Sequence, residues 1–279
     1  MAIESTDLGR GGKRVGQFAI EKELGRDGAG IVYAAHDDRS NRKVSLRLLP
    51  DAVRVDPARR ERVIADARAA MEIEHPSLAS IVDVGEAPEG MFVASELAEG
   101  RSIRERLDGD GKLDLATGLR IATEVASAIA ALHRAGRAHG ALDPGRVILD
   151  DAGRVKVIAQ GLGEVTGYPD RSEDVRAIGA LLKEMIDWRT APTAVDDLVR
   201  RATDPDPARR PADADALLSE LARIDLPSTP VGDSVVESRE AVTAGASRTW
   251  IVGASVVLAL VIAIGIAVMF AMTQQGGGG

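Results

Sequence analysis

The chain has 279 residues, of which 45% are hydrophobic and 28% are charged, which is enough apolar material for a folded core. Its net charge of -8 excludes the basic footprint of a nucleic-acid-binding protein. There is no cysteine, so disulfides, thiolate nucleophiles and thiolate metal sites are excluded, and the four histidines show no metal-ligand spacing.

The first part of the chain has the pattern of a small sheet. Residues 1–14 are rich in glycine and charge, and we expect a flexible leader there. Short apolar stretches separated by Gly, Asp, Asn and Ser then predict an antiparallel meander with one amphipathic helix inserted. The expected strands lie at 18–20, 31–35, 44–48, 81–84 and 91–95, and the expected helix at 58–74.

The second part is mainly helical. Two short apolar runs at 147–149 and 155–158 flank a turn and predict a hairpin. The expected helices lie at 102–107, 115–135, 173–187, 194–202 and 212–224. Few residues separate 173–187 from 194–202, so we expect no further helix between them.

The C-terminal region predicts a membrane anchor. The stretch from Ile251 to Met272 carries no charge and, at about 1.5 Å per residue, is long enough to cross a hydrocarbon core of roughly 30 Å. Arg239 and Arg248 precede it, and no charge follows it, so the positive-inside rule predicts a cytoplasmic N-terminal side. We therefore expect a single-pass protein of the inner or plasma membrane, with a linker at 227–249, a transmembrane helix at 250–272 and a glycine-rich tail at 273–279 outside.

Small residues recur every four positions in the expected transmembrane helix, from Ser255 to Ala271. Such a row lets two helices approach closely in lipid, which would give a homodimer. Exact four-residue spacing drifts around a helix of 3.6 residues per turn, so a monomeric anchor remains the alternative.

Several strings, in order, resemble the motifs of the bacterial eukaryotic-like serine/threonine protein kinases. LGRDGAGIVYAA is similar to the glycine-rich loop, VSLRLL to the strand with the ATP-binding lysine, and SELAEG to the hinge. AHGALDPGRVIL is similar to the catalytic loop, and RVKVIAQG to the strand before the metal-binding aspartate. The resemblance covers roughly Val15 to Ile224, and we expect the domain at 15–226. It implies an α+β, two-lobed fold, with a small antiparallel sheet lobe plus one helix and a larger helical lobe.

The resemblance also identifies positions where the family's chemistry has changed. Ala141 stands at the catalytic aspartate, and Asp143 at the lysine of the catalytic loop. The metal-binding asparagine and aspartate are replaced by Arg146 and Ala159, neither of which offers a lone pair to a cation. We therefore expect no bound metal. His139, Gly161, Asp174 and Arg210 match positions that hold the large lobe together.

The ATP-binding end has changed as well. Arg47 stands at the lysine position and Asp66 at the regulatory glutamate, and these two are expected to be able to keep an ion pair. Asp27 replaces the middle glycine of the loop, which adds a carboxylate near the phosphates. A vestigial nucleotide pocket would be lined by Gly25, Gly28, Gly30, Val32, Arg47, Glu96 and Ala98.

These substitutions together predict a membrane-anchored pseudokinase that is not an enzyme and acts as a signalling scaffold or binding module. Its partners would be unidentified signalling proteins, including an active kinase that phosphorylates the linker. Two alternatives remain open. The chain could be a regulatory module that binds nucleotide weakly and without metal. It could also be an atypical ATP-using serine/threonine kinase in which Arg146 stands in for the metal.

Overall fold

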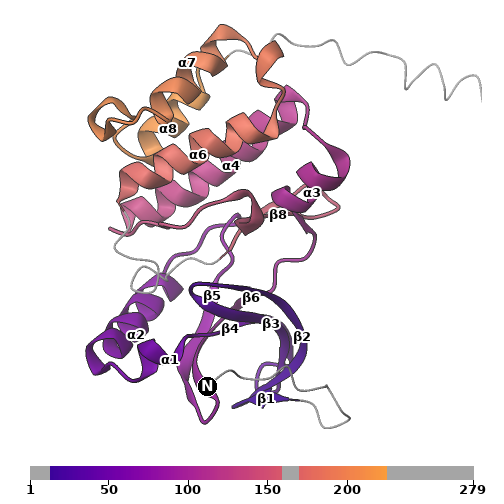
Figure 1. Cartoon of the computed structure of the whole chain (residues 1–279), viewed down its shortest axis with the longest axis vertical. Helices are drawn as coiled ribbons and strands as arrows, with labels where there is room; N and C mark the ends of the chain where they lie inside the picture. The colour runs from indigo at the N-terminus through magenta and orange to yellow at the C-terminus, as the bar shows by residue number, and fades with distance from the viewer. Residues whose placement is uncertain (1–12, 159–169, 225–279) are drawn as a thin grey trace, which may run out of the picture. The chain divides into compact units, whose positions relative to one another are not determined.

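A computed structural model describes residues 13–158 and 170–224. In this part of the chain a sheet lobe and a larger helical lobe lie end to end (Figure 1), which confirms the expected two-lobed arrangement. The expected linker, transmembrane helix and tail, most of the leader, and the positions of Ala159 and Gly161 lie outside the described residues.

The small lobe is built on an antiparallel sheet in the order β1-β2-β3-β4-β6-β5. Its strands are β1 (Arg14–Val15), β2 (Phe18–Asp27), β3 (Gly30–Asp37), β4 (Arg42–Leu48), β5 (Ile81–Ala87) and β6 (Gly90–Glu96). β2 runs further than the apolar pattern predicts, because ladder pairing with β3 continues to Asp27 and Gly30 at the hairpin tip. The polar end of this strand is exposed, which is why no alternation marks it.

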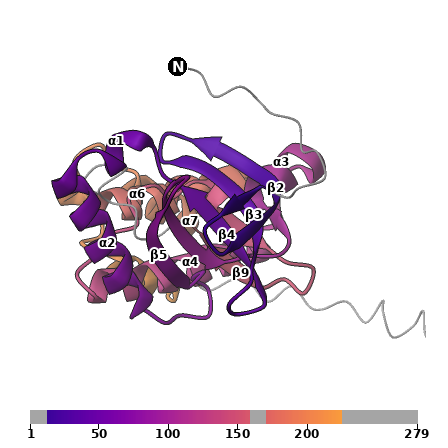
Figure 2. The ribbon, with the colours of Figure 1, turned by 90° about the horizontal axis from the view of Figure 1, so that it is seen from below.

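Helices α1 (Asp51–Arg54) and α2 (Pro57–Met71) lie to one side of this sheet (Figure 2). α2 begins where the Asp56 carboxylate accepts hydrogen bonds from two backbone N–H groups and proline occupies the first helical position. Its buried face, which includes Val63 and Ala67, packs in one cluster with Ile81 and Val84 of β5. The helix expected at 58–74 is therefore present, and it ends three residues earlier.

The large lobe contains a small sheet, β7-β8-β9, and the helical core. Its strands and single-turn helices are β7 (Arg101–Ser102), β8 (Val147–Leu149), β9 (Val155–Val157), η1 (Pro144–Arg146), η2 (Trp188–Thr190) and η3 (Pro207–Arg209). Its α-helices are α3 (Ile103–Asp110), α4 (Leu115–Arg134), α6 (Arg171–Met185), α7 (Thr193–Ala202) and α8 (Ala214–Leu221). Only η2 separates α6 from α7, as expected from the short spacing.

Helix α4 forms the centre of the large-lobe core. Ile121, Val125, Ile129 and Leu132 are buried at three- and four-residue spacing, and α6 and α8 pack against the helix. Within the described ranges, α4 alone is long and apolar enough to cross a membrane. Because 56% of its most apolar window is buried inside the lobe, this composition reflects core packing.

The two lobes are joined by backbone pairing as well as by the chain itself. The segment after α2 lies on β9, with Ala79 N–H donating to Val157 O at 2.9 Å and Val157 N–H donating to Ser77 O at 2.8 Å. At the hinge, Lys156 Nζ lies 2.8 Å from Glu96 Oε2. These contacts tie the sheet lobe to β9 of the large lobe.

Candidate functional site

A cavity of about 580 Å³ lies between the sheet lobe and the large lobe. Its walls come from the β2/β3 hairpin, from β4, from the hinge after β6 and, in the large lobe, from η1 and β8. The predicted pocket residues Gly25, Val32, Arg47, Glu96 and Ala98 line it, together with Asp27 and Arg146. Gly28 and Gly30, which were also predicted, are not among the lining residues.

Gly30 lies at the hairpin tip, where the backbone conformation and a close contact require glycine. Its φ is +124°, and a Cβ built there would lie 2.1 Å from the carbonyl oxygen of Leu48. Gly28, by contrast, has nothing within 4 Å of a built Cβ. Glycine at position 30 is therefore required for β3 to pass close to β4, and it shapes the cavity through the backbone.

Arg47 lies on the central strand β4 and is 9% exposed. Its guanidinium pairs with the Asp27 carboxylate at 2.5 Å, from Nη1 to Oδ1. Burial lowers the pKa of Arg47, and the bond to Asp27 opposes that shift. Burial would raise the pKa of Asp27, but the hydrogen bonds and charges of Arg47, the Ala29 N–H and Arg146 outweigh it and lower the pKa. Asp27 is thus ionised at neutral pH.

Arg146 approaches the same carboxylate from the large lobe. Its Nη2 lies 3.0 Å from Asp27 Oδ2, and its Nε lies 3.1 Å from Asp143 Oδ2. The remaining nitrogen, Nη1, is buried and has no hydrogen-bond partner among the described residues. Asp27 therefore bridges a guanidinium of each lobe, with one oxygen on each.

The ion pair between Arg47 and Asp66 does not form, which corrects the expectation from the sequence. Asp66 lies 3.0 Å from Arg137 Nη2. Arg137 follows α4, so Asp66 ties α2 of the small lobe to the large lobe while Asp27 takes Arg47. Reasoning from the family's pairing missed this because Asp27 supplies a competing carboxylate that the family's glycine does not.

The loop before η1, from His139 to Ala141, is held in place by hydrogen bonds to Asp174 and Ile158. Asp174 accepts hydrogen bonds from the backbone N–H groups of His139 and Gly140, both at 2.7 Å. The His139 ring is buried, with Nε2 2.9 Å from Ile158 O and Nδ1 accepting from Ala141 N–H at 3.3 Å. The resemblance matches Ala141 to the position of the base-like carboxylate that orients an acceptor hydroxyl, and its methyl group cannot do so.

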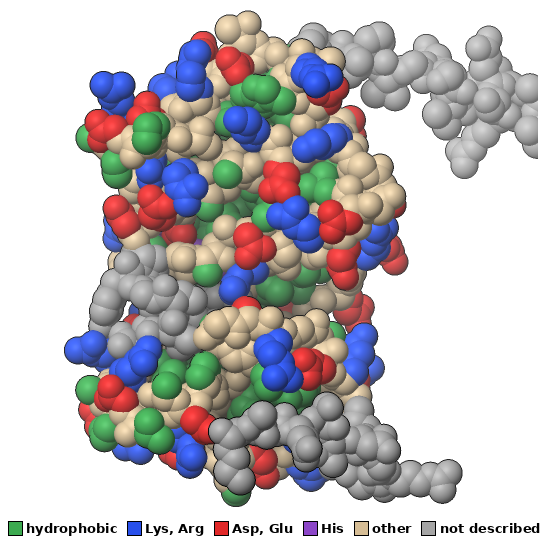
Figure 3. Space-filling view, in the orientation of Figure 1, with side chains coloured by type: hydrophobic (Ala, Val, Ile, Leu, Met, Phe, Trp, Pro, Cys, Tyr) green, Lys and Arg blue, Asp and Glu red, His purple; other side chains and the backbone are tan. Residues whose placement is uncertain are grey.

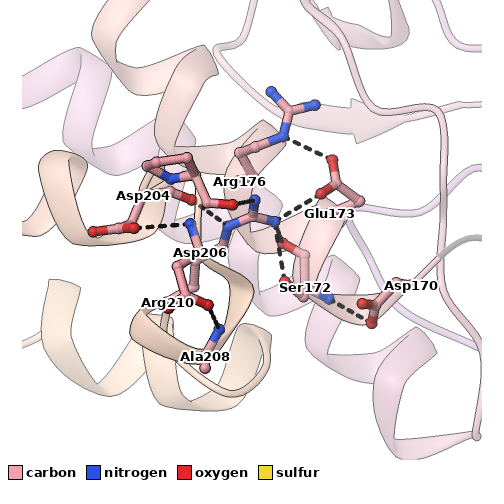
Figure 4. Close-up of polar contacts among 9 residues, drawn as sticks. Asp170, Ser172, Glu173, Arg176, Asp204, Asp206, Ala208 and Arg210 are labelled. Atoms are coloured by element: carbon pink, nitrogen blue, oxygen red, sulfur yellow. Dashed lines mark hydrogen bonds and ion pairs between the residues drawn. The ribbon is translucent and has the colours of Figure 1, made fainter.

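Arg210 joins the start of α6 to the segment between α7 and α8 (Figure 4). Its guanidinium is 4% exposed and donates to Asp204 O at 2.7 Å and to Glu173 Oε1 at 2.7 Å. Further bonds reach the carbonyl and hydroxyl of Ser172. His139, Asp174 and Arg210 thus have the lobe-stabilising contacts that the sequence predicts.

Magnesium, which the family's chemistry uses with ATP, does not fit this donor set. Position 146 presents a guanidinium that pairs with two carboxylates, and a guanidinium has no lone pair for a cation. The second ligand position is Ala159, which lies outside the described residues. Over 13–158 and 170–224, no group of three or more His, Cys, Asp or Glu side chains could hold a metal ion.

The two lobes, the hinge and the cavity between them define a protein-kinase-like domain. Residues 18–179, more than half of the chain, match the protein kinase domain model, and the chain belongs to this family. It is 27% identical over 204 residues to the serine/threonine-protein kinase PrkC of Bacillus subtilis, covering 64% of this chain and 32% of that protein. It is also 29% identical over 154 residues to PknA of Mycobacterium tuberculosis, covering 53% of this chain and 36% of that protein.

The solved kinase domain of Mycobacterium tuberculosis PknI has the same fold, with a TM-score of 0.64 at 20% sequence identity. The superposition covers 76% of this chain and 97% of that one. The chain spans about a third of the length of the curated relatives above.

These relatives overturn one expectation. The sequence reasoning classed the chain as a non-enzymatic pseudokinase scaffold, but its family match and its relatives named as serine/threonine kinases indicate an enzyme. The error was to treat each lost group as a lost function. Ala141 and Asp143 mark groups that are missing, while Arg47 and Arg146 place two positive charges at the cavity.

Proposed function

We propose that the chain is an atypical ATP-using serine/threonine kinase domain that binds the nucleotide between its lobes. The observation that carries the proposal is the interlobe cavity of about 580 Å³, which has an apolar part and a part lined by arginines. A volume of this size is in the usual range for small-molecule sites. The family match and the named activity of the relatives support ATP as the ligand.

The apolar part suits an adenine ring. Val32 and Ala34 line the cavity from the sheet lobe, and Ile148 and Ile158 line it from the large lobe. The hinge segment from Glu96 to Ala98 closes this end. Flat aromatic ligands gain most of their affinity from such apolar walls, and a few polar groups set their orientation.

The arginine part suits the phosphates. Arg47 and Arg146 converge on one carboxylate, so they are already arranged to hold an anion with two or more oxygens. Arginine beside a transferring phosphoryl group stabilises the charge that develops on its oxygens, by about 10³ to 10⁵ in rate in other phosphoryl-transfer enzymes. Because Ala141 offers no carboxylate, we expect transfer slower by roughly 10² to 10⁴ than in a kinase that has one.

A second candidate is a regulatory nucleotide-binding module without turnover. The specific observation in its favour is Ala141, which leaves the acceptor hydroxyl without an orienting base. Both candidates require nucleotide in the cavity, and only the first requires phosphate transfer.

The test uses the full chain with γ-labelled ATP, in magnesium, in manganese and in EDTA. We expect nucleotide binding and slow label transfer that is lost in Arg47→Met and Arg146→Met and retained in Arg120→Met, an exposed arginine of α4 that pairs with Glu124. Binding without transfer in any condition selects the regulatory module. Absence of binding overturns both candidates.

We also propose that residues 251–272 anchor the domain at the cytoplasmic side of a membrane. The support is the length and apolar character of this stretch and the arginines that precede it. Protease digestion of intact and of permeabilised cells checks it. Degradation of the kinase domain in intact cells would contradict this orientation.

A further inference from the structure

Four charged side chains meet at the arginine end of the cavity, and they neutralise one another. Asp27 forms ion pairs with both Arg47 and Arg146, and Asp143 forms an ion pair with the Nε of Arg146. Elsewhere, on the face drawn in Figure 3, acidic and basic side chains are interspersed at the surface. The cluster at the cavity differs because both of its cations are largely buried, with side chains 11% and 15% exposed. Buried cations of this kind require an anion.

The anion is the movable member of the cluster. Arg47 is fixed in the middle of the sheet, where its backbone pairs with Val32 on one side and Val93 on the other. Asp27 lies at the tip of the β2/β3 hairpin, and its side chain is 35% exposed. Its neighbour Gly28 has no atom near a built Cβ, so the tip has space to move. The carboxylate can leave more easily than either guanidinium.

One hydrogen-bond donor of the cluster, Arg146 Nη1, has no acceptor among the described residues. Both oxygens of Asp27 are used, one on each arginine, and Arg146 Nη1 remains buried with no acceptor in the described part of the chain. A carboxylate has two oxygens, whereas a terminal phosphate has three. A phosphate in place of Asp27 would satisfy the same two guanidiniums and offer a third oxygen to Nη1.

We propose that Arg47 and Arg146 form a metal-independent binding site for the terminal phosphates of a nucleotide, and that Asp27 is its built-in competitor. The Asp27 carboxylate occupies the site in the free protein and is displaced when a polyphosphate enters. The inference rests on the proposed nucleotide binding and adds the residues and the metal dependence. When Asp27 is displaced, its ion pair with Arg146 breaks. The phosphates of the nucleotide then connect the two lobes in its place.

Among the described residues at this end of the cavity, position 146 carries a guanidinium, which has no lone pair for a cation, and this favours the same reading. Magnesium neutralises part of the charge of a triphosphate and occupies some of its oxygens, which leaves less for two guanidiniums to bind. A site built from arginine therefore prefers the uncomplexed nucleotide. This preference is opposite to that of a site built from carboxylates and an asparagine.

The experiment measures the dissociation constants of ATP and adenosine for the full chain, with EDTA or with magnesium. The variant is Asp27→Asn, which removes the charge and keeps an oxygen that can accept the hydrogen bond from Ala29 N–H, now 2.9 Å long. The matched control is Asp38→Asn, which removes a carboxylate paired with Arg14 in the same lobe, outside the cavity.

We expect Asp27→Asn to bind ATP about tenfold more tightly in EDTA, because a competing negative charge a few ångströms away is gone. Adenosine, which has no phosphate, should bind the variant and the native chain equally, and Asp38→Asn should match the native chain for both ligands. Magnesium should weaken ATP binding to the native chain several-fold.

Three results would overturn the inference while leaving nucleotide binding intact. These are unchanged ATP affinity in Asp27→Asn, an equal gain for adenosine, and a requirement for magnesium. The last would mean that Asp27 and Asp143 serve as metal ligands. If neither ATP nor adenosine binds the native chain or Asp27→Asn, it is the proposed function itself that fails.

Discussion

The carboxylate of Asp66 lies 3.0 Å from the guanidinium of Arg137, in a contact that joins the helix α2 of the small lobe to the segment that follows α4. Both side chains are partly buried, 32% and 19% exposed. Asp66 thus links the lobes on one side of the domain, and Asp27 links them through Arg146 at the cavity. A residue of the large lobe thus pairs with α2, while Arg47 pairs with Asp27 at the cavity.

A double-mutant cycle tests this pairing. Because both side chains are mostly but not fully shielded from water, we expect Asp66→Asn and Arg137→Gln to couple by about 0.5 to 1 kcal/mol in the free energy of unfolding, measured by urea denaturation. The matched cycle, Asp66→Asn with Arg47→Gln, should show coupling near zero. Coupling in the second cycle and none in the first would restore the family's usual pairing.

The hairpin tip gives a second prediction, built on two glycines two residues apart. Gly30→Ala should lower the free energy of unfolding by about 2 to 4 kcal/mol, because a Cβ would overlap the Leu48 carbonyl oxygen and φ is positive. Gly28→Ala should stay within about 0.5 kcal/mol, since its Cβ meets open space. Similar losses in both variants would show that general loop stiffness decides the outcome.

The Arg210 network gives a third prediction. Arg210→Lys should destabilise the domain by about 2 to 4 kcal/mol, because one ammonium does not reach the Asp204 carbonyl, Ser172 and Glu173 together, and buried acceptors lose their donor. Arg209→Lys is the matched control. That side chain is 73% exposed, so we expect a change within about 0.5 kcal/mol.

The Glu173 partner should matter less. Its pKa is lowered, first by the hydrogen bond from Arg210 and then by that from Arg176. Because its side chain is nearly half exposed, Glu173→Gln should cost about 1 kcal/mol or less. Thermal or urea unfolding of all three variants checks the order. A loss in Glu173→Gln as large as in Arg210→Lys would assign the energy to the ion pair and not to the carbonyl bonds.

Stability should depend on pH through His139. Burial lowers the pKa of this histidine, and its contacts fit the neutral ring, with Nε2–H donating to Ile158 O and Nδ1 accepting from Ala141 N–H. The folded-state pKa is thus below the unfolded value of about 6.5, so the unfolded chain binds more protons in the window between them. The free energy of unfolding should fall as pH drops below about 6.5 and be at its full value above it.

The measurement is urea denaturation of the native chain and of His139→Gln between pH 5 and 7.5. The variant is expected to be less stable overall and to lose part of the pH slope. His75 contributes in the same window, because burial and then the charges of Arg134 and Lys156 lower its pKa. An unchanged slope in His139→Gln would mean that His139 is not the titrating group.

The sequence alone was sufficient for the two-lobed fold and for most of its elements. α4 was predicted at 115–135 and lies at Leu115–Arg134, because apolar residues at three- and four-residue spacing are a local signal. The hairpin of β8 and β9 was equally readable from its turn residues. A helix and a tight hairpin are both formed by residues that are close in the chain, so the spacing of apolar and turn residues is enough to predict them.

The pairing of the charged side chains was decided only by the tertiary structure. Sequence reasoning placed Arg47 with Asp66, and the fold places Arg47 with Asp27 and Asp66 with Arg137. Arg146, read as a lost metal ligand, proves to share Asp27 with Arg47. Long charged side chains choose the partner that the folded backbone brings within about 3 to 4 Å, and several carboxylates compete for each guanidinium. Spacing along the chain does not encode that choice, since the residues that meet at the cavity come from different lobes.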